Sequence, residues 1–211
     1  MTRTTVQRGG TAGLIGGALW ALLPVALTAV HIEDSERGTL SFAAVAVSYW
    51  VVGVLSLLLM LVGLSGLRGA LGDGAGRLAT VGIVVSAVAL LAMLLGNGTE
   101  MATLTFAGRE SDLGHSVFLI GFLALVVGSL LLGIALLRSR QGALVRWAGV
   151  LMVGMLPVGI GLGIGLNAVA PHTDLGFWAA ITVAYGLAWV LLGRWLSAPA
   201  EARVAAPSRV S

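Results

Sequence analysis

The chain of 211 residues contains no cysteine, and all twelve of its basic residues are arginine. Without cysteine, disulfides, thiol redox chemistry and thiolate metal sites are excluded, and without lysine a Schiff base on a lysine side chain is excluded. Charged residues make up only 10% of the chain, hydrophobic residues 58%, and the mean hydropathy is +1.01. So little polar surface cannot cover a soluble globule.

Arginine used alone, beside abundant alanine, glycine, valine and leucine, is typical of a GC-rich bacterial genome. We therefore expect an all-α integral protein of a bacterial plasma membrane.

Long apolar stretches account for most of the chain. A helix needs about 20 mostly apolar residues to cross a hydrocarbon core of roughly 30 Å. Six stretches meet this requirement, at 11–30, 40–66, 78–97, 113–137, 147–169 and 176–196. We therefore expect one polytopic six-helix transmembrane domain over 1–198, followed by a disordered cytoplasmic tail over 199–211.

Positive charge is confined almost entirely to one side of this six-helix arrangement. The arginines of the rich side are Arg3, Arg8, Arg68, Arg77, Arg138, Arg140, Arg146, Arg194, Arg203 and Arg209. Only Arg37 and Arg109 fall on the opposite side, together with most of the acidic residues. By the positive-inside rule both termini are cytoplasmic. Because orientation explains the arginines, they do not indicate nucleic acid as a partner, and the expected partner is the lipid bilayer.

The first span has a second interpretation. Arg3 and Arg8 precede an apolar run that ends in small residues at 26–29, as in a secretory signal peptide. This run is longer than the roughly 7 to 15 residues typical of a signal peptide. We therefore expect it to be retained as the first transmembrane helix.

The middles of the spans carry hydroxyl groups but no charged side chain and no histidine. The polar residues near the expected midplanes are Ser56, Ser86, Ser129 and Thr182. Proton relays and voltage sensors depend on charged residues inside the membrane. Their absence argues against a proton-coupled or voltage-driven machine, and it leaves open a path lined by backbone, hydroxyl or aromatic groups.

Glycines recur four residues apart in two of the spans. Gly13 and Gly17 continue a series that starts at Gly9, and the run GIGLGIG pairs Gly159 with Gly163 and Gly161 with Gly165. Small residues at this spacing let membrane helices approach closely. We expect these glycines to pack helices within the chain or in a homo-oligomer, with a glycine-lined passage as the alternative. Pro157, just before the run, predicts a kink.

Two further patterns concern the connections between spans. The motifs GLSGLR at 63–68 and GIALLR at 133–138 both end a span with arginine, which suggests a parallel repeat of the second and third spans in the fourth and fifth. Similar topological constraints can produce the same pattern without a repeat. The segment 98–112 is partly apolar. It either extends the third helix beyond a break at 96–98, lies on the membrane surface, or covers a cavity.

All three histidines lie on the arginine-poor side, each close to a carboxylate. They form one candidate site: His31, His115, His172, Asp112 and Asp174. Imidazole and carboxylate groups that converge from three helix ends could bind a divalent metal or haem, or serve a membrane hydrolase. The alternative is structural, because Ser111 and Thr173 stand where helix N-caps belong and an aspartate favours the first helical turn. No compact ligand motif is present, and we expect no cofactor.

Two cytoplasmic hairpins resemble known sequences. The segments GLSGLRGALGDGAGRLATVG at 63–82 and GIALLRSRQGALVRWAGVLMVG at 133–154 are similar to uncharacterised six-helix membrane proteins of actinobacteria and related bacteria. This resemblance implies a fold and no activity. We expect the protein to bind or pass a small uncharged or lipid-like molecule, or to support a partner membrane protein. An enzyme or metal site at the histidines is the alternative.

Overall fold

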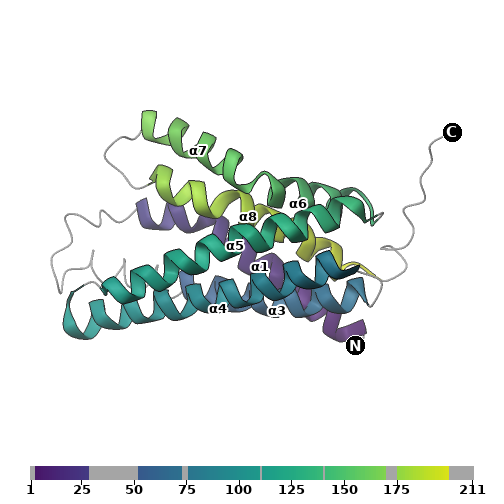
Figure 1. Cartoon of the computed structure of the whole chain (residues 1–211), viewed down its shortest axis with the longest axis horizontal. Coiled ribbons are helices and arrows are strands. Elements are labelled where there is room, and N and C mark those ends of the chain that lie inside the picture. Colours follow the sequence, from purple (N-terminus) through teal and green to yellow (C-terminus); the bar gives the residue numbers. More distant parts are fainter. Residues whose placement is uncertain are drawn as a thin grey trace.

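The computed structural model describes residues 3–28, 52–72, 76–109, 111–139, 141–169 and 175–199. All regular elements in these ranges are helices (Figure 1). They are α1 (Arg3–Thr28), α3 (Leu55–Leu71), α4 (Gly76–Ala107), α5 (Asp112–Arg138), α6 (Ala143–Val153), α7 (Met155–Val169) and α8 (Leu175–Ser197). The all-α prediction is confirmed for this part of the chain.

Several helices are long and apolar enough to cross a membrane. Four stretches meet this description: Val52–Leu71, Gly76–Ala107, Asp112–Arg138 and Trp178–Ser197. The bent pair α6 and α7 adds a fifth if it is counted as one span. The chain is thus compatible with a multi-pass membrane protein. The described residues do not confirm six spans, and parts of the spans expected at 11–30 and 40–66 lie outside them.

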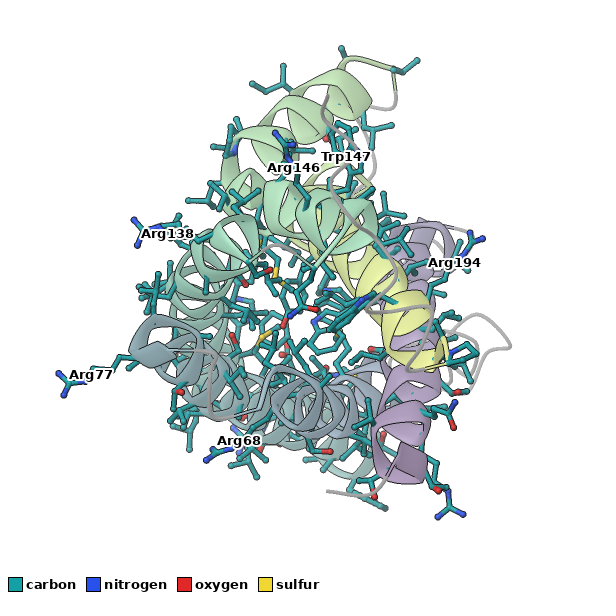
Figure 2. The ribbon with its side chains drawn as sticks, turned by 90° about the vertical axis from the view of Figure 1, so that its right-hand side faces the viewer. Arg68, Arg77, Arg138, Arg146, Trp147 and Arg194 are labelled. Carbon is teal, nitrogen blue, oxygen red and sulfur yellow. The ribbon has the colours of Figure 1, made fainter. Side chains whose placement is uncertain are left out.

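Six of the helices form a closed ring. Each packs against the next in the order α3, α4, α5, α6, α8, α1 and back to α3, while α7 packs mainly against α8 (Figures 1 and 2). Contacts of Gly9 with Gly66, and of Gly10 with Ser197, make α1 antiparallel to both α3 and α8. The start of α1 and the ends of α3 and α8 therefore lie at the same end of the bundle.

Small residues seven apart form the contact between α4 and α5. A Cβ atom added to Gly121 would lie 2.8 Å from the backbone nitrogen of Met93 and 3.0 Å from the carbonyl oxygen of Ala89. Equivalent backbone contacts recur along both helices at Gly82, Ala89 and Gly96 on α4 and at Gly114, Gly121 and Gly128 on α5. A seven-residue repeat keeps one seam facing the partner in a left-handed helix pair. This repeat, rather than four-residue spacing, brings the two backbones together.

The helix over 76–107 contains no break at Gly96, Asn97 and Gly98, so the expected interruption was wrong. Gly96 and Asn97 are buried, and Gly96 packs against the backbone of α5. The hydroxyl groups of Thr99 and Thr103 donate hydrogen bonds of 2.8 Å to carbonyl oxygens four residues earlier. Tertiary packing therefore outweighs the weak helix propensity of these residues. The segment 98–112 mainly extends the helix, up to Ala107.

A bend of 67° separates α6 from α7, close to the expected kink at Pro157. The bend is centred on Gly154, whose N–H donates to Val150 and whose carbonyl accepts from Val158. Pro157 lies in the first turn of α7, where a missing N–H is tolerated, and it cannot donate to the carbonyl of Val153. The break between the two helices therefore lies at Gly154, three residues before the proline, and α7 continues through Pro157. The internal repeat of spans stays a prediction.

Candidate functional site

Most of the described arginines gather at one end of the bundle, and Arg109, just beyond the end of α4, lies at the opposite end. Figure 2 looks toward the end with most of the arginines and shows Arg68, Arg77, Arg138, Arg146 and Arg194 projecting outward from the helix ring. Each lies in the first or last turns of its helix, and all five are exposed. We call this the arginine end. The directions of the helices therefore bring these five arginines to the same end of the bundle, as the charge pattern of the sequence predicts.

A cavity of about 240 Å³ opens at the arginine end. It lies where α3 ends, α4 begins and α5 ends. Its apolar wall consists of Leu71, Leu78, Ala79, Ala135 and Leu136, and its polar residues are Arg138, Ser139 and Gln141. The hydroxyl of Ser139 already donates to the carbonyl of Leu136 at 2.7 Å, which leaves Arg138 and Gln141 to offer donors to a ligand. The cavity thus combines an apolar wall with a cationic group.

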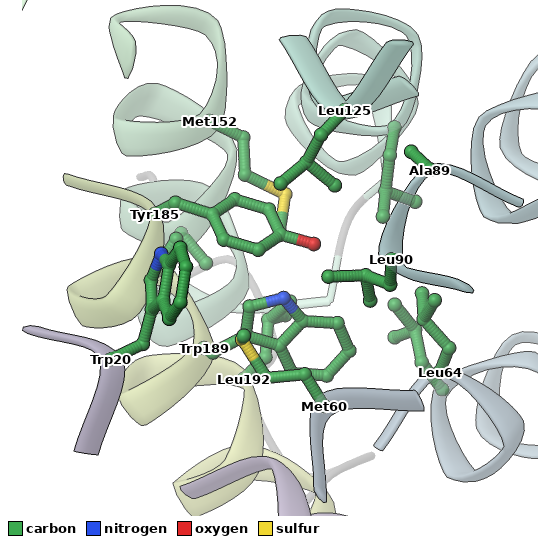
Figure 3. Packing of buried hydrophobic residues seen from close by; sticks show 14 of the residues in the cluster. Trp20, Met60, Leu64, Ala89, Leu90, Leu125, Met152, Tyr185, Trp189 and Leu192 are labelled. Atoms are coloured by element: carbon green, nitrogen blue, oxygen red, sulfur yellow. The ribbon is translucent and has the colours of Figure 1, made fainter. Parts of the chain in front are cut away.

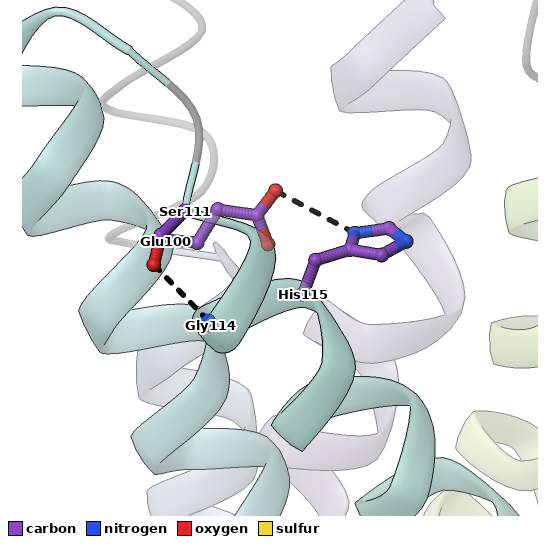
Figure 4. Close-up of polar contacts among 4 residues, drawn as sticks. All are labelled: Glu100, Ser111, Gly114 and His115. Carbon is purple, nitrogen blue, oxygen red and sulfur yellow. Dashed lines mark hydrogen bonds and ion pairs between the residues drawn. The ribbon is translucent and has the colours of Figure 1, made fainter.

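At the opposite end, the structure describes only part of the predicted histidine site. His115 Nδ1 lies 3.7 Å from Glu100 Oε1, and the His115 side chain is 57% exposed (Figure 4). Asp112 is exposed in the first turn of α5. His31, His172 and Asp174 lie outside the described residues. Within the described ranges, no three histidine, aspartate or glutamate side chains come together to hold a metal.

The helix-capping interpretation of this region is confirmed at one of its two positions. Ser111 precedes α5 in an extended conformation, and its side-chain oxygen accepts a hydrogen bond of 3.1 Å from the N–H of Gly114 (Figure 4). This satisfies one of the free N–H groups at the helix start. Thr173, the second expected cap, is outside the described residues. The hydrogen bond explains Ser111 without a ligand.

The centre of the helix ring is filled by large side chains. Figure 3 shows Tyr185 and Trp189 of α8 directed inward among Met60, Leu90 and Leu125. All five are at most 1% exposed. The two aromatic rings meet edge to face, with centroids 6.4 Å apart. Since side chains from four helices of the ring meet here, the packing argues against an open passage along its axis.

The expected packing glycines fall into two groups. Gly13 and Gly17 contact Trp189, while Gly159 and Gly163 approach the backbone and side chains of α8. Gly161 and Gly165 are exposed, and a Cβ atom on either would meet nothing within 4 Å. Half of the GIGLGIG run therefore packs α7 onto α8, and the other half faces outward.

Sequence reasoning missed the cavity and the inward cluster of aromatic side chains. The cavity is lined by residues from the ends of three helices, and the sequence does not show that these ends lie together in space. The spacing of four between Tyr185 and Trp189 does predict that they share one face of α8. That signal could have indicated the cluster.

Comparisons with protein-family models, curated proteins and solved structures find no match to this chain. The resemblance to uncharacterised six-helix membrane proteins therefore stays a prediction. The features of the molecule that bear on its function are the cavity, the filled centre and the arginine end.

Proposed function

We propose that this protein is a multi-pass plasma-membrane protein that binds a lipid-like molecule in the cavity at the arginine end. The observation that carries the proposal is the cavity itself, with its apolar wall and with Arg138 among its lining residues. An acyl chain that moves from the bilayer onto such a wall stays in an apolar environment, so the transfer exposes no apolar surface to water. A guanidinium group pairs well with a phosphate through two parallel hydrogen bonds. Together these features suit a phospholipid with an acidic headgroup.

The arginines at one end of the bundle predict an orientation in the membrane, and that orientation suits lipid binding in the cavity. If the positive-inside rule holds for this chain, the arginine end and both termini face the cytoplasm. Bacterial and other cytoplasmic leaflets carry anionic lipids, and a basic residue near the membrane surface gains about 1 kcal/mol from them. The cavity would then lie at the headgroup level of an anionic leaflet. A bacterial plasma membrane is part of the same proposal.

The binding test uses the purified full-length chain and a fluorescent phosphatidylglycerol. Ala135→Phe fills the cavity with a bulky ring, and the matched control is Ala143→Phe, because Ala143 is exposed near the same end. We expect Ala135→Phe to weaken binding at least fivefold and the control to leave it unchanged. Equal affinities of these two variants would refute binding in the cavity.

The headgroup is tested separately at Arg138. We expect Arg138→Gln to weaken phosphatidylglycerol binding about fivefold, the equivalent of about 1 kcal/mol. Binding of zwitterionic phosphatidylcholine should weaken less, since its choline group offsets the charge of the phosphate that both lipids carry. An equal loss for both lipids would show that Arg138 does not recognise the net negative charge of the headgroup.

Support of a partner membrane protein, or association with a second copy, is a second candidate. The observation in its favour is the outward face of α7, where Gly161 and Gly165 lie beside the exposed side chains of Ile160 and Ile164. Small residues flanked by branched apolar ones allow close helix packing in lipid. Crosslinking from this face in membranes tests the idea, and the absence of a defined crosslinked product would contradict it.

A further inference from the structure

The cavity at the arginine end has its apolar and charged residues at different depths. Ala79 and Leu136 are almost completely buried, at 2% and 1% exposed, whereas Arg138 is exposed and projects from the end of α5 (Figure 2). The deep part of the cavity is therefore apolar, and the guanidinium group lies at its opening. A ligand that matches both parts has a negative charge at one end and an apolar body behind it.

Arg138 has no acidic neighbour within the described ranges. The acidic residues in these ranges are Glu100 and Asp112, and both lie toward the opposite end of the bundle. No described carboxylate therefore compensates the charge of the guanidinium group. Such a group can bind the carboxylate or phosphate of a ligand through two parallel hydrogen bonds.

The volume of the cavity limits the size of the ligand. An apolar protein cavity of about 150 Å³ takes up one benzene molecule, which has about six non-hydrogen atoms. At the same density, the cavity of about 240 Å³ has room for about ten. A carboxylate with a single chain of about eight carbons has this size, whereas the two acyl chains of a membrane phospholipid are much larger.

The apolar wall begins directly beside Arg138. Ala135 and Leu136 lie within the preceding turn of α5, and Leu71 and Leu78 line the same cavity from α3 and α4. In a phospholipid, the atoms next to the phosphate belong to the glycerol and its ester groups, which would lose hydrogen bonds to water against such a wall. A phospholipid therefore has to keep these groups at the opening. In a fatty acid, methylene groups follow the carboxylate directly, so the whole chain can enter.

We propose that the cavity also binds the anion of a free fatty acid of about eight carbons, with its carboxylate at Arg138 and its chain against the apolar wall. This inference rests on the proposed function, because it uses the same cavity. It adds a ligand class that dissolves in water and can reach the opening without first entering the bilayer. Fatty acid and phospholipid then compete for Arg138.

The length of the chain is tested by equilibrium dialysis of radiolabelled saturated carboxylates against the full-length protein in phosphatidylcholine nanodiscs. Empty nanodiscs give the uptake into lipid, which is subtracted. We expect the affinity to rise about fourfold for each added CH₂ group, because each group leaves water for an apolar wall. The rise should stop at about eight carbons, where the cavity is full. A rise that continues to about sixteen carbons would overturn the proposal, since the cavity would not limit the chain.

Two substitutions should move this limit in opposite directions. Ala135→Leu adds about three carbon atoms to the cavity wall, so the limit should fall to about five carbons, and Leu71→Ala removes the same number, so it should rise to about eleven. Ala143→Leu, at an exposed residue near the same end, is the matched control and should leave the limit unchanged. A misfolded protein would lose binding at every chain length and would not shift the limit. The same limit in both cavity variants would overturn the proposal.

The charge is tested with octan-1-ol, the uncharged analogue of octanoate. Octanoate should bind at least about fivefold more tightly than octan-1-ol, and Arg138→Gln should remove this preference. Equal binding of the two compounds by the unchanged protein would overturn the pairing with Arg138. If fluorescent phosphatidylglycerol binds but no carboxylate binds saturably, this inference is wrong and the proposed function stands. If neither binds, both are wrong.

Discussion

Two glycines of α4 that are two residues apart should respond in opposite ways to the same substitution. A Cβ atom on Gly96 would meet the backbone nitrogen of Phe118, and would lie 2.7 Å from the carbonyl oxygen of Gly114 and 2.8 Å from the Cα atom of Phe118. A Cβ atom on Gly98 would meet nothing within 4 Å. Both residues are helical, so their replacement by alanine changes helix propensity equally. The difference between the variants isolates the contact between α4 and α5.

The expected magnitudes follow from these contacts. Replacement of glycine by alanine inside a helix is worth about 1 kcal/mol of helix propensity, which should appear undiminished in Gly98→Ala. In Gly96→Ala the neighbouring atoms are backbone and cannot rotate away, so the two helices must move apart. Overpacking of this kind costs roughly 1–3 kcal/mol. We therefore expect Gly96→Ala to be less stable than Gly98→Ala by about 1–3 kcal/mol, which is roughly a 5- to 150-fold difference in the unfolding equilibrium constant.

The assay is reversible unfolding of each purified variant in mixed micelles, with a titration of denaturing detergent monitored by circular dichroism. A shift of the midpoint with an unchanged slope reports stability. Gly96→Leu should lower stability further, since a larger side chain separates the helices more. If Gly96→Ala proved as stable as Gly98→Ala, the close approach of α4 and α5 at Gly96 would be refuted.

Three further substitutions test other parts of the structure. Gly159→Leu should loosen α7 from α8 and lower the thermal midpoint, while Gly161→Leu should leave it unchanged; an equal loss in both variants would contradict the outward placement of Gly161. Ser111→Ala should lower the free energy of unfolding by about 1 kcal/mol through loss of the helix cap, and Ser111→Asp should restore most of it; no loss on replacement by alanine would show that the cap is unimportant. His115→Ala should change stability in the same titration by less than about 1 kcal/mol, because the His115 side chain is 57% exposed and lies 3.7 Å from Glu100; a larger loss would show that this pairing is a strong contribution to the fold.

The glycines show where sequence reasoning succeeds and where it stops. The four-residue spacing in GIGLGIG predicts two glycine faces on one helix, and the structure has both. Only Gly159 and Gly163 meet α8, because the rotation of α7 about its own axis decides which face is covered. A local pattern defines faces but does not define that rotation.

The straightness of α4 is a second case. Glycine and asparagine at 96–98 predict a break on propensity alone. The helix continues because Gly114 of α5 lies opposite Gly96. Neither residue has a side chain, so the two backbones can come into close contact. The same residue type that weakens an isolated helix thus strengthens a packed pair.

At the candidate sites, the sequence identified individual residues but not the residues that lie next to them in space. It placed His115 and Asp112 at a helix start, and the cap at Ser111 is present. It could not indicate that Tyr185 and Trp189 would face Leu90 and Leu125, since these residues come from helices far apart in the chain. Their meeting depends on the closure of the helix ring.

By itself, the sequence determined that this is an apolar helical protein with most of its arginines on one side. Length, hydropathy and charge can be read along the chain without knowledge of what packs against each segment. The tertiary structure alone decided which glycines touch another backbone, that α4 continues through 96–98, and that large side chains from four helices fill the centre of the ring. Those outcomes depend on how each helix is rotated and on what lies opposite it. Both are set by packing between distant segments, where one close backbone contact outweighs local preference.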